Sequence, residues 1–260
     1  MKYIKKYIKT SVLFNILKNI RSNYLVLTRS LKNCCYIVEM EKVYEDKIII
    51  LINKPQNIII YSDKKFSNNS LLKVMNKRYK KIKVINRIDK ETAGLILISK
   101  DKLSNIDLYK QMIKKRIKKN YIALIYGEIF PKNGEIKTKI RNKNEKITIS
   151  KSSITFYRTI NVYENKILSL LEIELKTGIT HQIRLHMKYK NTSIIGDLKY
   201  FVKKNIVSKE KYSNFKYLEG QGLQAYKISF IHPISLQFFQ FTIPINFKLK
   251  NVISLYNIIN

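Results

Sequence analysis

The amino-acid sequence predicts an α+β fold built on a large mixed sheet with flanking helices. Runs with strand character outnumber those with helical spacing, and short turns join most of them, as in antiparallel hairpins. The chain has 260 residues, of which 45% are hydrophobic. This length and composition allow a substantial buried core and exclude a wholly disordered chain.

The first half combines strand-like runs with one helix. Residues 46–54 and 94–101 are apolar runs of strand length, typical of strands buried on both faces, and 57–63 resumes the first run after a Lys-Pro break. Residues 102–119 predict an amphipathic helix, because apolar side chains recur at helical spacing opposite a Lys- and Arg-rich face. The apolar positions are Ile106, Tyr109, Met112, Ile113 and Ile117.

The middle of the chain predicts hairpins. Residues 121–130 have strand character, and 167–178 forms a strand expected to stop at Gly178. Turn signals at 133–134 and 164–165 are typical of antiparallel hairpins.

The last third begins with a short helix and ends with a hairpin. We expect the helix at 180–190, with Thr180 as its cap. Residues 201–221 are polar and predict a surface excursion. Residues 226–235 and 237–245 predict the last hairpin, before a C-terminal apolar segment.

The charge balance indicates an acidic partner. The chain carries 51 Lys and Arg against 18 Asp and Glu, a formal net charge of +33. RNA, DNA or an anionic membrane surface would fit this excess, although a general bias toward Lys, Ile, Asn and Tyr can explain part of it. No apolar run reaches the roughly 18 residues that span a bilayer, so we expect no transmembrane segment.

The N-terminal segment has its own composition. The first 38 residues carry eight Lys and Arg and no acid, which suits an organellar transit peptide or an RNA-binding arm. We therefore divide the chain into a basic segment, 1–41, and a main domain, 42–260. The only two cysteines are adjacent and predict neither a structural disulfide nor a zinc site. We expect a cytoplasmic protein, or an organellar one if the segment is a transit peptide.

Asp89 is the first candidate for chemistry. It is an acid between basic residues, in a loop with Arg87 and Thr92 between two buried strands. Its residue type alone fits a turn or helix cap, or a surface ion, but a loop held by rigid strands is where catalytic side chains usually lie. Arg184 fits an exposed helical arginine and Tyr121 a core aromatic just as well.

Motifs of other enzyme classes are missing from the sequence. It has no P-loop, dinucleotide fingerprint or serine-hydrolase elbow. His181 and His186 are five residues apart with no acid between them, so we expect no metal site.

Six stretches between residues 43 and 247 resemble, in order, the motifs of the RluA-type RNA pseudouridine synthases. They are VYEDKIIILINKP, NRIDKETAGLILISK, KNYIALIYGEI, KTGITHQIRLHM, IIGDLKYF and LQAYKISFIHP. The resemblance implies the pseudouridine synthase fold, whose mainly antiparallel sheet is divided by an RNA-binding cleft, and a reaction that needs no cofactor. It makes residues 42–260 the catalytic domain, and it adds a remnant of an S4-like RNA-binding domain, which many relatives carry, to the alternatives for residues 1–41.

The resemblance also implies roles for individual residues. Asp89 matches the catalytic aspartate, Arg184 its arginine partner, and Tyr121 the tyrosine that packs on the target ring. Arg87 matches an arginine that stabilises the flipped-out nucleotide. The implied substrate-binding residues are Arg87, Asn86, Thr92, Thr180, His181 and Gln182.

Three positions depart from the family pattern. Asn86 replaces the usual His, Ala93 replaces Ser, and Ile179 replaces an Arg beside the turn expected to face RNA. None of them alters the aspartate, its arginine or the tyrosine, so we expect activity with altered substrate contacts.

The sequence thus predicts a monomeric RNA pseudouridine synthase that acts on ribosomal RNA, with transfer RNA as the alternative substrate. The competing hypothesis is a catalytically silent RNA-binding or ribosome-assembly factor of the same fold. A protein that binds anionic membranes would leave the six motifs unexplained.

Overall fold

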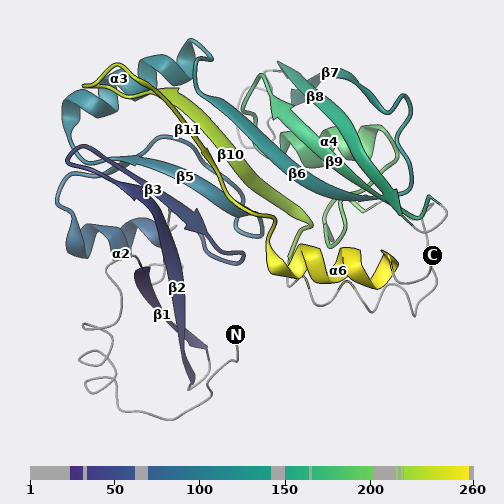
Figure 1. Cartoon of the computed structure of the whole chain (residues 1–260), viewed down its shortest axis with the longest axis horizontal. Helices are drawn as coiled ribbons and strands as arrows, with labels where there is room; N and C mark the ends of the chain where they lie inside the picture. Colours follow the sequence, from purple (N-terminus) through teal and green to yellow (C-terminus); the bar gives the residue numbers. More distant parts are fainter. Residues whose placement is uncertain are drawn as a thin grey trace.

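An eleven-stranded sheet organises the part of the chain that the computed structural model describes (Figure 1). The described residues are 24–31, 34–61, 70–141, 150–163, 166–201, 215, 218 and 220–257. The strands are β1 (Tyr24–Leu31), β2 (Cys34–Glu45), β3 (Ile49–Lys54), β4 (Lys83–Val84), β5 (Ala93–Ser99), β6 (Lys118–Tyr126), β7 (Asn133–Arg141), β8 (Ser150–Tyr163), β9 (Leu168–Leu175), β10 (Leu223–Ile231) and β11 (Phe238–Thr242). The helices are α2 (Leu71–Arg78), α3 (Lys102–Ile113), α4 (Gln182–Tyr189) and α6 (Phe247–Asn257).

The sheet is mixed and mainly antiparallel. Its order is β1-β2-β3-β5-β10-β6-β9-β8-β7, with β11 paired to β10 and β4 paired to β5. Strand β10 runs parallel to β5, and the other pairings of described strands are antiparallel. The predicted α+β fold with a large mixed sheet is confirmed.

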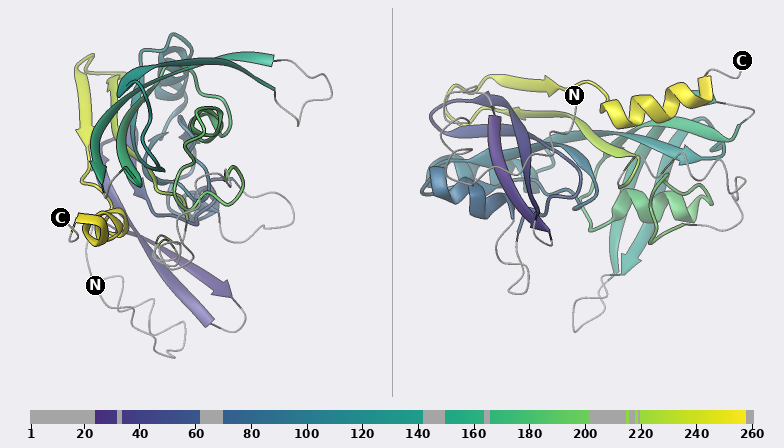
Figure 2. Two further views of the ribbon diagram at one scale, coloured as in Figure 1. Left: turned by 90° about the vertical axis from the view of Figure 1, so that its right-hand side faces the viewer. Right: turned by 90° about the horizontal axis from the view of Figure 1, so that it is seen from below.

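Strand β6 shows how the two faces of the sheet are covered. Successive side chains of a strand point to opposite faces. Ala123 packs in one cluster with Ile183 of α4, whereas Leu124 packs in another with Leu249 of α6. Figure 2 shows these two helices on opposite sides of this part of the sheet. Both faces are therefore buried, which explains the apolar composition of β6.

The other half of the sheet follows the same rule. Ile96 of β5 packs with Met75 of α2, and Leu97 packs on the opposite face with Leu108 of α3. Strands β3 and β5 confirm the strands that the sequence predicted at 46–54 and 94–101, both buried on two faces. Their observed ends differ from the predicted ends by a few residues.

The two halves of the sheet meet where β5 pairs with β10, and a glycine makes this pairing possible. Strand β5 meets β10 through only two pairs, one of which is Gly94 with Ala225. Gly94 has φ 122°, and a Cβ there would lie 2.2 Å from the Ala225 carbonyl oxygen. Only glycine allows the two backbones to approach so closely.

The apolar face predicted for residues 102–119 is confirmed only in part, since Ile117 lies in the core and Met112 packs partly buried against it. Ile106, Tyr109 and Ile113 are exposed, and α3 ends at Ile113, well before residue 119. The helix buries Leu108 and Gln111 instead. The Gln111 amide donates to the backbone oxygen of Ile231 at 2.7 Å and accepts from its nitrogen at 3.0 Å. A polar side chain is thus buried in the core because it hydrogen-bonds the backbone at the end of β10. The helical spacing of apolar residues gives no sign of this.

Two other predicted elements differ from the structure. Residues 58–61 form no strand, because the carbonyls of Ile59 and Ile60 accept hydrogen bonds from the first residues of α2. The pair at 133–134 begins β7 and makes no turn. Gly134 lies opposite Tyr157, whose hydroxyl would be 3.2 Å from an added Cβ, so this glycine makes room for a ring.

The later predictions have mixed outcomes. The hairpin at the end of the chain is confirmed by antiparallel β10 and β11, and the turn at 164–165 lies outside the described residues. Strand β9 ends at Leu175, before Gly178. The surface excursion predicted for 201–221 is wrong where the structure describes it, since Phe215 and Leu218 pack into the core against α6.

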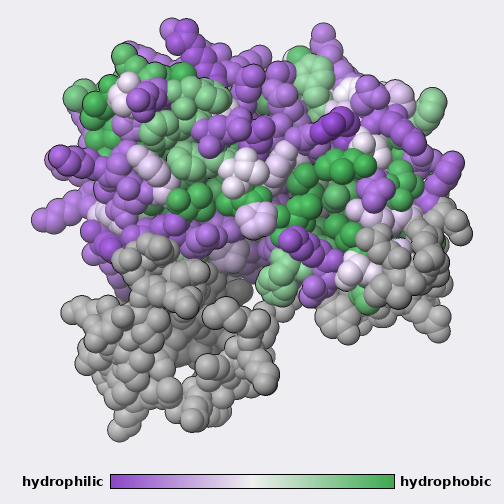
Figure 3. Space-filling model, viewed as in Figure 1, coloured by the Kyte–Doolittle hydropathy of each residue, from purple (hydrophilic) through white to green (hydrophobic). Residues whose placement is uncertain are grey.

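The N-terminal segment is described only in part. Residues 1–23 lie outside the described residues, and the boundary predicted between 41 and 42 falls within β2. Figure 3 shows hydrophilic side chains over much of one face of the described molecule, with apolar areas between them. No described helix is long and apolar enough to cross a membrane.

Candidate active site

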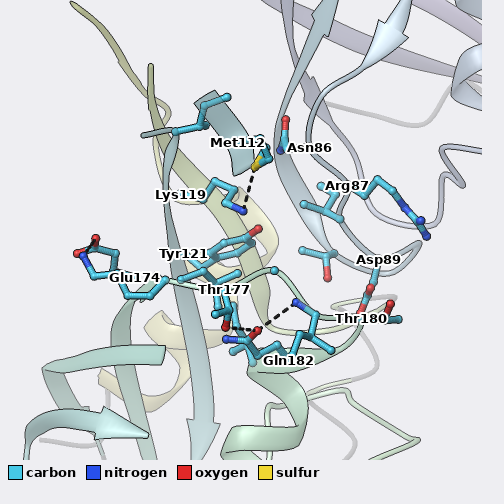
Figure 4. Close-up of a pocket in the computed structure, with 18 of the residues that line it drawn as sticks. Asn86, Arg87, Asp89, Met112, Lys119, Tyr121, Glu174, Thr177, Thr180 and Gln182 are labelled. Carbon is cyan, nitrogen blue, oxygen red and sulfur yellow. Dashed lines mark hydrogen bonds and ion pairs between the residues drawn. The ribbon is translucent and has the colours of Figure 1, made fainter. Parts of the chain in front are cut away.

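A cleft of about 490 Å³ opens beside the junction of β5, β10 and β6. Its walls come from the β4–β5 loop, the end of α3, the start of β6 and the segment from the end of β9 into α4 (Figure 4). The residues that the resemblance named and that line it are Asn86, Arg87, Asp89, Thr92, Tyr121, Thr180, His181, Gln182 and Arg184. The fold therefore brings all of them around one cavity.

Asp89 and Arg184 form an ion pair in this cleft. The Arg184 Nη1 donates to Asp89 Oδ2 at 2.9 Å, although the two residues are 95 positions apart. Arg184 is 5% exposed, whereas the Asp89 side chain is 25% exposed and so remains open to a ligand. The carboxylate is thus held by a buried cation with one edge facing the cavity.

Asp197 fixes the other side of Arg184. The Nε and Nη2 of Arg184 donate to the two oxygens of Asp197, at 2.7 Å and 2.8 Å. The guanidinium also lies over the Tyr200 ring, 4.9 Å from its centroid. Burial opposes the charge of Arg184, but the hydrogen bonds to Asp197 and Asp89 outweigh it and raise the pKa above the usual value. Arg184 is therefore a permanently charged and rigid partner for Asp89.

Tyr121 forms one wall of the cleft. It lies in β6, and its residue is 5% exposed. Burial raises the pKa of its phenol well above 10, and the charge of Asp89 acts in the same direction. The ring offers a flat surface for a base, and its hydroxyl stays protonated at neutral pH.

His181 lies near Asp89. It is the N-cap residue of α4, with a left-handed backbone at φ 58°. Its Nδ1 is 2.9 Å from the Tyr200 hydroxyl, and its Nε2 is 3.8 Å from Asp89 Oδ2. Burial lowers the pKa of His181, Asp89 opposes this shift, and Arg184 adds to it. The cap predicted at Thr180 is wrong, since Thr180 is exposed and precedes the cap position.

Two predicted substrate-binding amides are bonded within the protein. Both ends of the Asn86 side chain bond the backbone of β5, through Leu95 O at 3.0 Å and Leu97 N at 2.7 Å. Gln182 is bonded at both ends too, including 2.8 Å to Thr177 and 2.9 Å to Thr155. Both amides are thus anchored within the protein while they line the cleft, and their contact with substrate stays a prediction.

The remaining predicted contacts differ in exposure. Arg87 is exposed, and its guanidinium lies over the Tyr61 ring, 5.6 Å from the centroid. Thr92 is buried, and its hydroxyl donates to Gln221 Oε1 at 3.2 Å. Gln221 also donates to the Glu91 carboxylate at 3.0 Å. Arg87 is thus free to meet a ligand, whereas Thr92 holds the loop in place.

Sequence reasoning missed a buried lysine behind the loop. The Lys54 Nζ is fully buried and donates to the backbone oxygens of Pro55, at 2.9 Å, and Lys90, at 3.1 Å. Burial lowers its pKa to about 7, and the charge of Asp89 opposes that shift. Its Lys-Pro sequence suggested only a strand break, because nothing local shows that the amine reaches the residue after Asp89.

No group of three His, Cys, Asp or Glu side chains that could hold a metal ion occurs in the described ranges.

The comparisons with known proteins agree with one another. The family model for RNA pseudouridylate synthase matches residues 48–189. The ribosomal large subunit pseudouridine synthase C of Rickettsia felis is 35% identical over 191 residues, which are 70% of this chain and 61% of that protein. The ribosomal large subunit pseudouridine synthase D of Buchnera aphidicola subsp. Baizongia pistaciae is 30% identical over 230 residues, 83% of this chain and 72% of that protein.

A solved structure shares the fold. Human RNA Pseudouridylate Synthase Domain Containing 4 superposes with a TM-score of 0.68 at 16% identity, over 83% of this chain and 92% of that one. The chain spans less than two thirds of the length of the Rickettsia protein. Since the family model matches more than half of the residues and the sequence relatives have the same description, the chain belongs to the RNA pseudouridylate synthase family.

Proposed function

We propose that this protein converts specific uridines of RNA to pseudouridine, with Asp89 as the reactive carboxylate. The observation that carries the proposal is the ion pair of Asp89 with buried Arg184, in a cleft that Tyr121 also lines. A catalytically silent RNA-binding protein would have no use for this carboxylate, because a negative charge in the binding cavity repels the phosphates of RNA. Family membership supports the same reaction.

The reaction is an isomerisation. The bond between N1 of uracil and C1′ of the ribose breaks, the base turns, and C5 bonds to C1′. The C5 proton is lost and N1 gains a proton, so no atom or electron is added overall. Asp89 is placed to act as nucleophile or base on the nucleotide, and Tyr121 supplies a surface against which the base can stack. The nucleotide has to leave its helical stack to reach this cleft.

Ribosomal RNA is the substrate that we propose. The relatives from Rickettsia felis and Buchnera are both described as ribosomal large subunit pseudouridine synthases. The net charge of +33 provides the phosphate attraction that such a substrate requires. A monomeric state and a cytoplasmic location stay predictions.

Mapping of pseudouridine in cells tests the proposal. Carbodiimide-detected pseudouridines are compared in total RNA from cells with and without the gene, then after rescue with wild type, Asp89→Asn or Glu135→Gln. We expect one or a few sites to vanish and to return with wild type and with Glu135→Gln, since Glu135 is an exposed carboxylate of β7. Asp89→Asn should restore none of them. Full rescue by Asp89→Asn would contradict the enzymatic proposal, and a restored site in transfer RNA would replace the proposed substrate.

A further inference from the structure

The cleft contains the half-buried Lys119, whose amine has no role in the reaction described above. Lys119 stands on β6 two residues before Tyr121, so both side chains leave the same face of the strand. Both line the cleft, and Figure 4 shows both directed into it. The amine is therefore placed beside the ring that offers the stacking surface for the base.

The protein provides this amine with only a weak partner. Its Nζ contacts the Met112 sulfur at 3.7 Å, and a thioether is a poor acceptor. A Cβ added at Gly178 would lie 3.4 Å from the Nζ, so the amine reaches across to the opposite wall of the cleft. No carboxylate within the described ranges pairs with Lys119, and burial lowers its pKa.

The acids of the cleft have other partners. Asp89 is held by Arg184, and Glu174 pairs with Lys176 at 2.6 Å. The other cations that line the cavity are Arg87, Lys115 and Lys118. A partly buried ammonium without a carboxylate partner gains most from an oxygen that a ligand brings with it.

The proposed reaction brings such an oxygen. When the N1–C1′ bond breaks, its electron pair stays on the base, and the negative charge spreads onto the two carbonyl oxygens of uracil. Addition of Asp89 to the ring would place charge on the same kind of oxygen. A fixed cation in a cavity shielded from water lowers the energy of that charge.

We propose that Lys119 donates a hydrogen bond to a carbonyl oxygen of the target uracil and stabilises the negative charge that the base carries during the reaction. This inference rests on the proposed function and assigns a residue to one step of it. Lys119 transfers no proton in this role, because it remains an ammonium from the binding of uridine to the release of product.

Single-turnover kinetics test the catalytic part of the proposal. The probe is an unmodified transcript of the organism's large-subunit ribosomal RNA at saturating protein. We expect Lys119→Met to lower the rate about 100-fold with little change in Kd, and Lys119→Arg to recover part of the loss. Lys250→Met, which removes an exposed charge from α6, should match wild type. Thermal unfolding of each variant shows whether it is folded, and Lys119→Gln replaces any variant that is not.

Two kinetic outcomes overturn the proposal. One is a wild-type rate in folded Lys119→Met. The other is a loss confined to Kd, which would indicate a contact with a backbone phosphate. Transcripts with 2-thiouridine or 4-thiouridine at the target then identify the oxygen, since thio substitution at the contacted carbonyl should slow wild type but not slow Lys119→Met further.

Amine labelling tests the contact without catalysis. The protein is treated briefly with an acylating reagent, alone, with uridine or with inorganic phosphate, and labelling of Lys119 and Lys250 is measured by mass spectrometry. We expect uridine to protect Lys119 and not Lys250, and phosphate alone to protect neither. Absence of protection by uridine, or protection by phosphate alone, overturns the contact. If wild type modifies no RNA at all, the proposed function fails, and the labelling still decides whether Lys119 meets the base.

Discussion

At the scale of single residues, the cleft depends on one arginine between two carboxylates. Arg184 uses Nε and Nη2 to bind Asp197 and keeps Nη1 for Asp89. The motif resemblance identified Arg184 and Asp89 from the sequence alone. It did not reveal that Asp197, 13 residues beyond Arg184, orients the guanidinium. Asp197 is therefore a positioning residue for the proposed reaction.

Replacement of Asp197 tests whether this residue acts by holding Arg184 in position beside Asp89. Asp197→Asn leaves Arg184 buried with an incomplete partner, so we expect the free energy of unfolding to fall by about 3 kcal/mol. The single-turnover rate should fall at least about tenfold, because Asp89 then faces a mobile cation. Urea unfolding and single-turnover assays measure the two effects. Arg158→Gln, which breaks a surface pair with Glu172, is the control and should change both very little. Equal effects of the two variants would contradict the positioning role.

Lys54 predicts a pH dependence of stability. Its pKa is about 7 in the folded protein, because of burial, and near 10.5 when the chain is unfolded. Between these values the unfolded state binds more protons, so this residue makes the protein more stable as the pH rises from 7 toward 10.5.

The comparison with Lys54→Met isolates this effect. The unfolding free energy of wild type minus that of Lys54→Met should rise over this range, by an amount on the order of 3 kcal/mol. Urea unfolding at a series of pH values measures it, with Lys250→Met as the control for loss of one positive charge. A difference that stays constant with pH would show that burial does not lower the pKa of Lys54.

At the scale of elements, periodicity predicted strands better than it predicted the helix. In β5 and β6 both faces are buried, so a continuous apolar run was a sufficient signal. In α3 three of the apolar residues at helical spacing, Ile106, Tyr109 and Ile113, are exposed, whereas Gln111 is buried and bonds the end of β10. Hydrogen bonds between distant elements thus decided which face of α3 is buried.

A pair of glycines tests the junction of β5 and β10. Gly94→Ala would place a Cβ 2.2 Å from the Ala225 carbonyl oxygen, so we expect the strands to separate and soluble protein to be lost. Gly127→Ala has a similar positive φ but no atom within 4 Å, so it should cost only about 1 kcal/mol. Soluble yield and urea unfolding compare the two. Similar stability of both variants would show that close approach of the strands is not required.

At the scale of the whole molecule, the net charge accounts for attraction of RNA, and the fold accounts for the reactive cleft. The net charge of +33 attracts a polyanion, whereas the cleft presents the carboxylate of Asp89, which is already paired with Arg184. Phosphate contacts position an RNA without selecting its sequence. Affinity and chemistry should therefore respond differently to salt.

Salt titration tests this division. RNA affinity should fall steeply with salt, roughly 10³-fold between 50 mM and 200 mM if about six phosphates are contacted. The single-turnover rate at saturating RNA should hardly change, because the Asp89–Arg184 pair is shielded from solvent ions. Filter binding and single-turnover assays measure the two quantities. An affinity that does not depend on salt would contradict a role of the net charge in RNA binding.

The fold class, most of the strands and the six motifs that identify the family could be predicted from the sequence, because strand periodicity and motif spacing are properties of neighbouring residues. The sequence also pointed to Asp89, Arg184 and Tyr121. Only the folded chain reveals that Asp197 holds Arg184 in place beside Asp89. The same holds for the burial of Lys54 behind the loop, for the lack of a carboxylate partner for Lys119 within the described part of the chain, and for the buried face of α3. These features depend on contacts between distant segments, and no local pattern in the sequence carries them.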